Sequence, residues 1–260
     1  MNELLQKAIQ AALQAGQEIL KIYEQDFAVE HKADESPLTQ ADLASNRVIV
    51  DFLKNTQIPI ISEEMQQEKY ALRKDWARFW LVDPLDGTKE FVNRNGEFTV
   101  NIALIEKGKP VLGVIYAPCL KWLYFADETG SFKQEKITQY SEFSKDLAQK
   151  LHYQKPQNNV VVVASRSHLN EPTEKFIQKL NLKYQSVEKI SMGSSLKLCL
   201  VAESKAHVYP RFAPTMEWDI AAGHAICRFA GVPVVQAETG EPIAYNKENL
   251  LNPYFLVGEV

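Results

Sequence analysis

The chain has 260 residues, of which 45% are hydrophobic and 24% are charged. This composition predicts a globular protein of one or two domains that buries a full core without disulfides. The 29 basic and 33 acidic residues give a net charge of −4. Because a nucleic-acid polymer is held by a dense face of Lys and Arg, this charge argues against such a partner, whereas a small phosphorylated ligand is still compatible with it.

Cysteines and the N-terminus bear on the compartment. The three cysteines leave one unpaired in any disulfide scheme and lack the CxxC spacing of a zinc site, which favours reduced thiols. Met1-Asn2-Glu3 has an acid where a signal peptide is basic, and no apolar run approaches the ~18 residues of a membrane span. We therefore expect a cytoplasmic protein without a transmembrane segment; loose association with the inner membrane stays open.

The first half of the chain mixes helix and strand patterns. Apolar residues at helical spacing predict amphipathic helices over residues 4–23 and about 40–54. A short apolar piece at 58–61 leads into Glu63 and Glu64, and a strand at 77–82 stops at Asp83. Further strands are expected in three β-type segments, at 98–105, 111–116 and 122–126.

The second half alternates strands with helices. The polar stretch 134–159 separates the two halves and is the best candidate for a domain boundary. Beyond it, strands are predicted at 160–164, 185–190, 206–209 and 232–235, and helices at 172–180, 194–202 and 219–230. We therefore predict an α+β domain over residues 1–150 and an α/β domain over 151–260.

The most informative run, WLVDPLDGTKEF, occupies residues 80–91. Asp83 follows an apolar strand, Asp86 can turn back beside it, and Gly87 permits a tight turn into a helix near Thr88. Two close carboxylates repel each other unless a hard cation such as Mg²⁺ lies between them, and the amides at the helix start suit a phosphate oxygen. Alone, the run is more typical of a strand–turn–helix corner in which Asp is a turn residue and helix cap.

Four other acidic residues also have structural interpretations. Glu63 and Glu64 can be a solvated pair, Thr39 with Asp42 can form a capping box, and Asp219 can cap the helix that it opens. The helix start at Asp219 is nevertheless unusual, because the small residues after it allow close packing.

Four elements, in this order and spacing, resemble the inositol monophosphatase superfamily. WLVDPLDGT at 80–88 is similar to its first signature and WDIAAG at 218–223 to its second, while Glu63-Glu64 and Thr39–Asp42 match its Glu-Glu and Thr-x-x-Asp elements. The agreement extends over about residues 1–257 and outweighs the separate structural interpretations. The resemblance implies a layered αβαβα sandwich with the site between the two domains.

Finer details resemble the CysQ-type 3′(2′),5′-bisphosphate nucleotidases within that superfamily. Residues 88–91 read TKEF where the inositol enzymes have TTNF. The runs RNGEFTVNIA (94–103), SRSH (165–168), GSSLK (193–197) and YPR (209–211) agree as well. The resemblance therefore implies a phosphoric monoester hydrolase that converts 3′-phosphoadenosine 5′-phosphate (PAP) to AMP and phosphate, as in the disposal of a by-product of sulfur metabolism.

The resemblance also implies a set of metal and catalytic residues. Glu63, Asp83, Asp86, the carbonyl of Leu85 and, from the second domain, Asp219 would bind two or three Mg²⁺ ions, with inhibition by Li⁺. Thr88, linked to Asp42, would accept the proton of the attacking water, which makes Asp42, Thr88, Glu63 and Asp83 the catalytic set.

Substrate selection is expected mainly from the second domain, because a bisphosphate nucleotide carries a second phosphate. The residues expected to bind it are Ser195, Lys197 and Arg211, with backbone donors from Gly193-Ser194. His168 would lie along the adenine or ribose, and the scissile phosphate would contact the metal carboxylates, Leu85, Gly87 and Thr88. Lys197 lies in an apolar helix, where a lysine can also extend its charge to the surface.

Two alternatives follow from the same residues. One is an inositol or other sugar monophosphatase of the same superfamily, which needs no second phosphate pocket. The other is a non-catalytic nucleotide-binding protein on the same scaffold, although every metal carboxylate is present. The sequence does not choose between a monomer and a homodimer.

Overall fold

The central sheet has seven strands and organises the molecule. The computed structural model describes residues 2–25, 29–31, 37–164 and 170–260. Neighbouring strands of the sheet are antiparallel except β3 and β4, which are parallel. In sheet order they are β3 (Ile60–Ser62), β4 (Arg78–Asp86), β5 (Thr99–Glu106), β6 (Lys109–Ala117), β7 (Trp122–Asp127), β8 (Gly130–Glu135) and β9 (Gln149–Lys150).

Both faces of this sheet are covered by helices. Trp80 and Val82 of β4 pack toward α1 (Glu3–Tyr23) and α2 (Gln40–Leu53), whereas Phe79 and Leu81 belong to the core under α6 (Leu196–Ala202) and α7 (Glu217–Ala230). Successive side chains of a strand point to opposite faces, so a strand covered on both sides becomes apolar throughout. This explains the nearly unbroken apolar run of β5.

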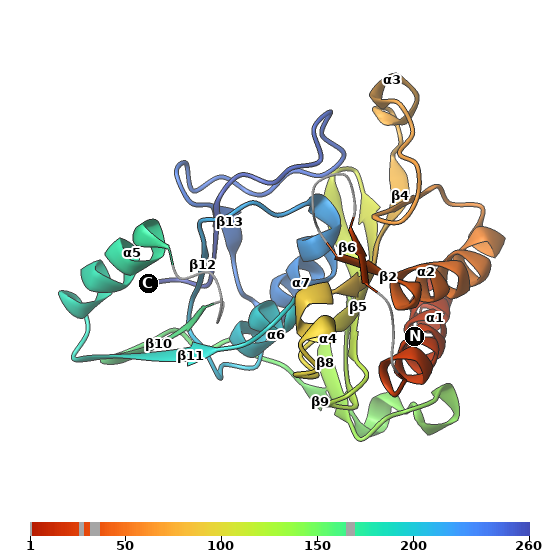
Figure 1. The fold of residues 1–260 in the computed structure, drawn as a ribbon. Helices are drawn as coiled ribbons and strands as arrows, with labels where there is room; N and C mark the ends of the chain where they lie inside the picture. Colours follow the sequence, from red (N-terminus) through yellow and green to blue (C-terminus); the bar gives the residue numbers. More distant parts are fainter. Residues whose placement is uncertain (1, 26–28, 32–36, 165–169) are drawn as a thin grey trace.

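The remaining elements complete a five-layer arrangement (Figure 1). A parallel pair, β10 (Asn159–Ala164) and β11 (Ser186–Ser191), and an antiparallel sheet in the order β12-β14-β13 lie beyond α6 and α7, and α5 (Glu171–Asn181) is outermost. The expected αβαβα sandwich is confirmed. The strands of the small sheet are β12 (Tyr209–Arg211), β13 (Val234–Gln236) and β14 (Phe255–Val257).

Shorter elements connect these layers. They are β1 (Val29–His31), β2 (Pro37–Thr39), α3 (Tyr70–Arg73), α4 (Thr88–Val92) and three 3₁₀ turns, Lys54–Thr56, Tyr140–Glu142 and Lys145–Leu147. Among the described residues, no helix combines the length and apolar character needed to cross a membrane.

Several boundaries differ from the sequence-based prediction. β4 does not stop at Asp83 but continues to Asp86. β8 was not predicted because its buried positions include polar side chains, among them Lys133, which is 2% exposed and paired with Glu203. β14 was not predicted either, and the strand expected at 206–209 forms at 209–211. The predicted helix 219–230 begins two residues earlier, so Asp219 is its third residue rather than its cap.

The two halves of the chain share one core. α7 lies so close to β6 that a Cβ atom on Gly113 would come within 2.4 Å of the Ala222 carbonyl oxygen. Gly223 makes a similar close approach to Leu198 of α6. The small residues of α7 therefore allow the close packing anticipated from the sequence. The division at residue 150 stays a prediction.

Candidate active site

A β-bulge in β4 lies between Asp83 and Asp86 and changes the direction of their side chains relative to each other. Residues three apart on a regular strand point to opposite faces. Here Asp83 is paired with Asn101 and Asp86 with Thr99, so three steps on β4 match two on β5. The extra residue is a β-bulge, a feature that redirects side chains next to functional sites. It allows both carboxylates to reach the same side of the sheet edge.

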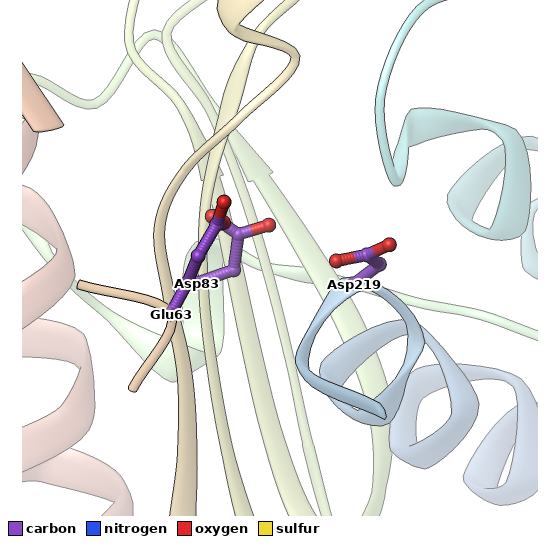
Figure 2. A group of neighbouring side chains, drawn as sticks. All are labelled: Glu63, Asp83 and Asp219. Atoms are coloured by element: carbon purple, nitrogen blue, oxygen red, sulfur yellow. The ribbon is translucent and has the colours of Figure 1, made fainter. Parts of the chain in front are cut away.

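Glu63, Asp83 and Asp219 form a carboxylate cluster. One oxygen of each lies within 4.8 Å of the others. Figure 2 shows the Glu63 and Asp83 carboxylates together, with Asp219 facing them from the first turn of α7. Glu63 follows β3, Asp83 lies in the neighbouring strand β4, and the Asp219 carboxylate also accepts the Met216 amide at 2.9 Å. Three segments far apart in the sequence thus converge at one point.

The electrostatics of the cluster favour a bound cation. Asp83 is 1% exposed, and its burial, followed by the charges of Glu63, Asp86, Asp219 and Asp42, raises the pKa of Asp83 well above its usual range. Burial and then the Asp86 charge also raise the pKa of Asp219. A cation would offset both the desolvation of the charged carboxylates and their mutual repulsion. These oxygens are therefore suited to a hard divalent ion.

Asp42 and Thr88 meet beside this cluster. Asp42 forms the expected capping box of α2, because its Oδ2 accepts the Thr39 amide at 2.8 Å and the Thr39 hydroxyl at 2.7 Å. Its Oδ1 lies 3.4 Å from Thr88 Oγ1, which is the same distance from the Leu85 carbonyl oxygen. Thr88 opens α4 after Gly87, which has a φ of 91° that suits glycine. The structural and catalytic interpretations of Asp42 are therefore compatible.

A cavity of about 120 Å³ adjoins the acidic residues. Its lining combines acidic side chains with two cations. It includes Asp86, Gly87, Glu90, Ser194, Ser195, Lys197, Tyr209, Arg211 and Asp219. Most of the expected substrate residues thus line one space with two of the carboxylates. Glu90 and Tyr209 were not predicted for this site.

Lys197 is held inside the protein and does not extend to the surface. It is 6% exposed, and its Nζ donates to the Ser194 carbonyl at 2.6 Å and to the Met192 carbonyl at 3.3 Å. Burial lowers the pKa of Lys197 to about 8, although the Asp86 charge opposes this effect. Two backbone oxygens therefore use two ammonium protons and leave the third for a ligand.

The segment before α6 uses its donors differently from the expectation. The Gly193 amide donates to Glu97 at 2.8 Å and the Ser195 amide to Asp86 Oδ2 at 2.6 Å, so neither points to an open anion site. The Ser195 hydroxyl donates to the Asp219 carbonyl at 2.5 Å. In contrast, Ser194 Oγ is buried without a hydrogen-bond partner among the described residues, and Ser194 has a strained φ of 46°.

Arg211 has a similar unpaired atom. Its Nε is buried without a partner in the described part of the chain, while its NH2 group donates to the Pro214 carbonyl at 3.1 Å. Buried polar atoms are normally hydrogen-bonded, and a ligand in this cavity would be positioned to pair with these two. His168 lies outside the described residues.

Asn101 is a site residue that the sequence analysis did not single out. It is 1% exposed in the largely apolar strand β5, and its amide donates to both Asp86 and Ser195. An asparagine inside an apolar strand was the available signal, since a buried amide requires partners.

Comparison with known proteins decides the family. The model of the inositol monophosphatase family matches residues 1–254. This chain belongs to the inositol monophosphatase family. Among curated members, the 3′(2′),5′-bisphosphate nucleotidase CysQ of Salmonella typhimurium is 45% identical and that of Escherichia coli K12 is 44% identical, each over 98% of this chain and 99% of its own length.

Solved structures of the inositol monophosphatase family agree with this fold. The crystal structure of CysQ from Bacteroides thetaiotaomicron has a TM-score of 0.88 and 51% identity, with 97% of this chain and 95% of that chain covered. The inositol monophosphatase of Thermotoga maritima has a TM-score of 0.77 at 23% identity, with 99% and 92% covered, and supports the fold alone.

Proposed function

We propose that this chain is a Mg²⁺-dependent 3′(2′),5′-bisphosphate nucleotidase that hydrolyses PAP to AMP and phosphate. The observation that carries the proposal is the juxtaposition of two sites. The carboxylates of Glu63, Asp83 and Asp219 lie within 4.8 Å of one another, and Asp219 also lines a cavity with the cations Lys197 and Arg211. The identity to curated bisphosphate nucleotidases over nearly the whole chain supports the same activity.

The donor set fits Mg²⁺. All of the donors are carboxylate oxygens, apart from the carbonyl of Leu85, and Mg²⁺ prefers oxygen and retains water where few protein ligands are supplied. Burial, followed by repulsion between neighbouring carboxylates, raises the pKa values of Asp83 and Asp219, and a divalent ion would offset both effects. Two or three ions would be held by Glu63, Asp83, Asp86, Leu85 and Asp219. Li⁺ is the expected inhibitor. When bound, Mg²⁺ acts as a Lewis acid on the phosphate and makes a coordinated water more acidic.

Thr88 and Asp42 would move the proton of the attacking water. Thr88 Oγ1 is 3.4 Å from Asp42 Oδ1, and Thr39 fixes the other carboxylate oxygen of Asp42. With its own proton directed to Asp42, the Thr88 oxygen offers a lone pair to the water. The pair would then act as a general base beside the scissile phosphate, which the amides of Gly87 and Thr88 would help to hold.

Lys197, Arg211 and Ser194 would hold the second phosphate. Lys197 contributes its remaining ammonium proton, Arg211 its unpaired Nε, and Ser194 its unpaired hydroxyl. Charge-assisted hydrogen bonds of this kind are roughly twice as strong as neutral ones. Gly193 and Ser195 would shape this pocket through their backbone, and His168 would contact the nucleoside.

Phosphate release from a substrate panel tests the proposal. PAP, inositol monophosphate and fructose bisphosphate are each assayed with Mg²⁺ and with EDTA. We expect Mg²⁺-dependent release with a strong preference for PAP. Lys197→Met should raise the KM for PAP and leave inositol monophosphate turnover, if any, unchanged. Preference for inositol monophosphate would favour the sugar monophosphatase alternative, and no release from any substrate would favour the non-catalytic one.

A further inference from the structure

Asn101 uses both protons of its side-chain amide on site residues. Its Nδ2 donates to Asp86 Oδ2 at 3.2 Å and to Ser195 Oγ at 2.9 Å. Its Oδ1 accepts the hydroxyl of Thr99 at 2.9 Å, which fixes the orientation of the amide. Burial of an apolar residue at this position would cost less free energy than burial of an amide. The amide therefore needs an explanation beyond packing.

Ser195 extends the same network to α7. A hydroxyl has one proton, and Ser195 donates it to the Asp219 carbonyl at 2.5 Å. The Ser195 oxygen is therefore an acceptor toward Asn101. The Ser195 amide also donates to Asp86 Oδ2 at 2.6 Å. Four residues form one continuous chain of hydrogen bonds, from Asp86 through Asn101 and Ser195 to Asp219.

This chain of hydrogen bonds connects the central sheet to the segments at the starts of α6 and α7. Asp86 and Asn101 come from neighbouring strands of the central sheet, Ser195 precedes the helix of Lys197, and Asp219 lies in the first turn of α7. Two donors converge on Asp86 Oδ2, so the carboxylate is held in one rotamer with Oδ1 left for another partner. The hydrogen-bond partners of a metal-binding side chain set its orientation and the affinity for the metal. Loss of Asn101 should therefore weaken Mg²⁺ binding.

We propose that Asn101 is a positioning residue which, through Ser195, fixes Asp86 and Asp219 relative to each other for Mg²⁺ binding. This inference rests on the proposed function, since it assumes that these carboxylates bind Mg²⁺. It assigns Ser195 to the same network and leaves contact with the second phosphate to Ser194, Lys197 and Arg211.

Mg²⁺ titration by calorimetry tests the inference without requiring turnover. Asn101→Leu removes the amide and keeps the branched shape of the side chain. The matched control is Tyr124→Phe, which removes the hydrogen bond between the same sheet and Glu203 at the opposite end of α6. We expect Asn101→Leu to weaken Mg²⁺ binding by roughly 10- to 100-fold and Tyr124→Phe to change it by less than about twofold. Phosphate release by Asn101→Leu should recover at high Mg²⁺.

The outcomes separate the inference from the proposed function. Wild-type Mg²⁺ affinity in Asn101→Leu overturns the inference, whatever its activity. Equal weakening in Asn101→Leu and Tyr124→Phe also overturns it, because a general loss of stability would then be the cause. If Asn101→Leu does not fold, Ser195→Ala breaks the same chain of bonds and must weaken Mg²⁺ binding. Absence of Mg²⁺ binding by the wild-type protein contradicts the proposed function instead.

Discussion

Arg73 and Asn246, which are 173 positions apart in the sequence, each donate a hydrogen bond to the other. The Arg73 guanidinium donates to the Asn246 side-chain oxygen at 2.7 Å, and the Asn246 amide donates to the Arg73 carbonyl at 2.6 Å. The Asn246 backbone amide in turn donates to Glu217 at 2.7 Å, next to the start of α7. Arg73 lies in the excursion between β3 and β4 that begins with Glu63. Two segments that carry carboxylates of the acidic cluster are therefore linked by hydrogen bonds outside the site.

Asn246→Gly tests this connection. Asn246 has a φ of 67°, so glycine preserves the backbone while the side-chain bonds are lost. Because buried Arg73 would lose a partner, we expect the free energy of unfolding to fall by roughly 2–3 kcal/mol, measured by urea denaturation. Mg²⁺ binding should weaken as well. Asn249→Ala removes an exposed side-chain bond nearby and should leave both quantities almost unchanged. Equal stability of the two variants would contradict the expectation.

Asp83→Asn should abolish PAP hydrolysis and leave the fold intact. Burial and neighbouring carboxylates raise the pKa of Asp83, so the folded metal-free protein binds more protons than the unfolded chain above about pH 4. Its stability therefore falls as the pH rises from there through the raised pKa. In EDTA at neutral pH, the variant should melt at or above the wild-type temperature, and Mg²⁺ should stabilise only the wild type. Wild-type phosphate release by the variant would exclude the proposed metal chemistry.

The KM for PAP should depend on pH through Lys197. Burial lowers the pKa of this lysine to about 8, so its charge is present below that pH and is lost as the pH rises through it. We expect the KM to rise roughly tenfold between about pH 7 and pH 9, as one charged hydrogen bond is lost. Steady-state kinetics of Lys197→Arg provide the control, because arginine keeps its charge throughout this range. A KM of Lys197→Arg that rises as steeply as that of the wild type would assign the titration to another group.

Gly113→Ala should disturb the site from a distance. The added methyl group would meet the Ala222 carbonyl at 2.4 Å and the Ala225 Cβ at 2.7 Å, which pushes α7 away from the sheet. We expect a loss of roughly 1–3 kcal/mol in unfolding free energy and a higher Mg²⁺ requirement, because Asp219 moves with the helix. Gly108→Ala, which meets nothing within 4 Å but has a φ of 72°, should lower stability without changing the Mg²⁺ requirement. A higher requirement in both variants would refute this explanation.

Local patterns were sufficient to predict much of the fold. The helical spacing at residues 4–23 and the small residues after Asp219 correspond to α1 and α7 as the structure has them. β8 could not be found in this way, because the buried Lys133 pairs with Glu203, which lies 70 positions away. Propensity and pattern describe neighbours in sequence, and this pairing depends on tertiary structure.

The same distinction applies to the site. Asp83 and Asp86 were singled out from a single run, but their orientation depends on a bulge that only the register with β5 reveals. Likewise, the sequence alone does not distinguish the roles of the adjacent serines Ser194 and Ser195. Only their partners distinguish the hydroxyl committed to Asp219 from the one left unpaired.

The convergence of Glu63, Asp83 and Asp219 from distant segments has a consequence for how the protein opens. A cation held by all three is released by any fluctuation that separates α7 from the sheet. Mg²⁺ should therefore suppress unfolding of the molecule as a whole, and amide hydrogen exchange should slow together in β4, β5 and α7 rather than near the ion alone.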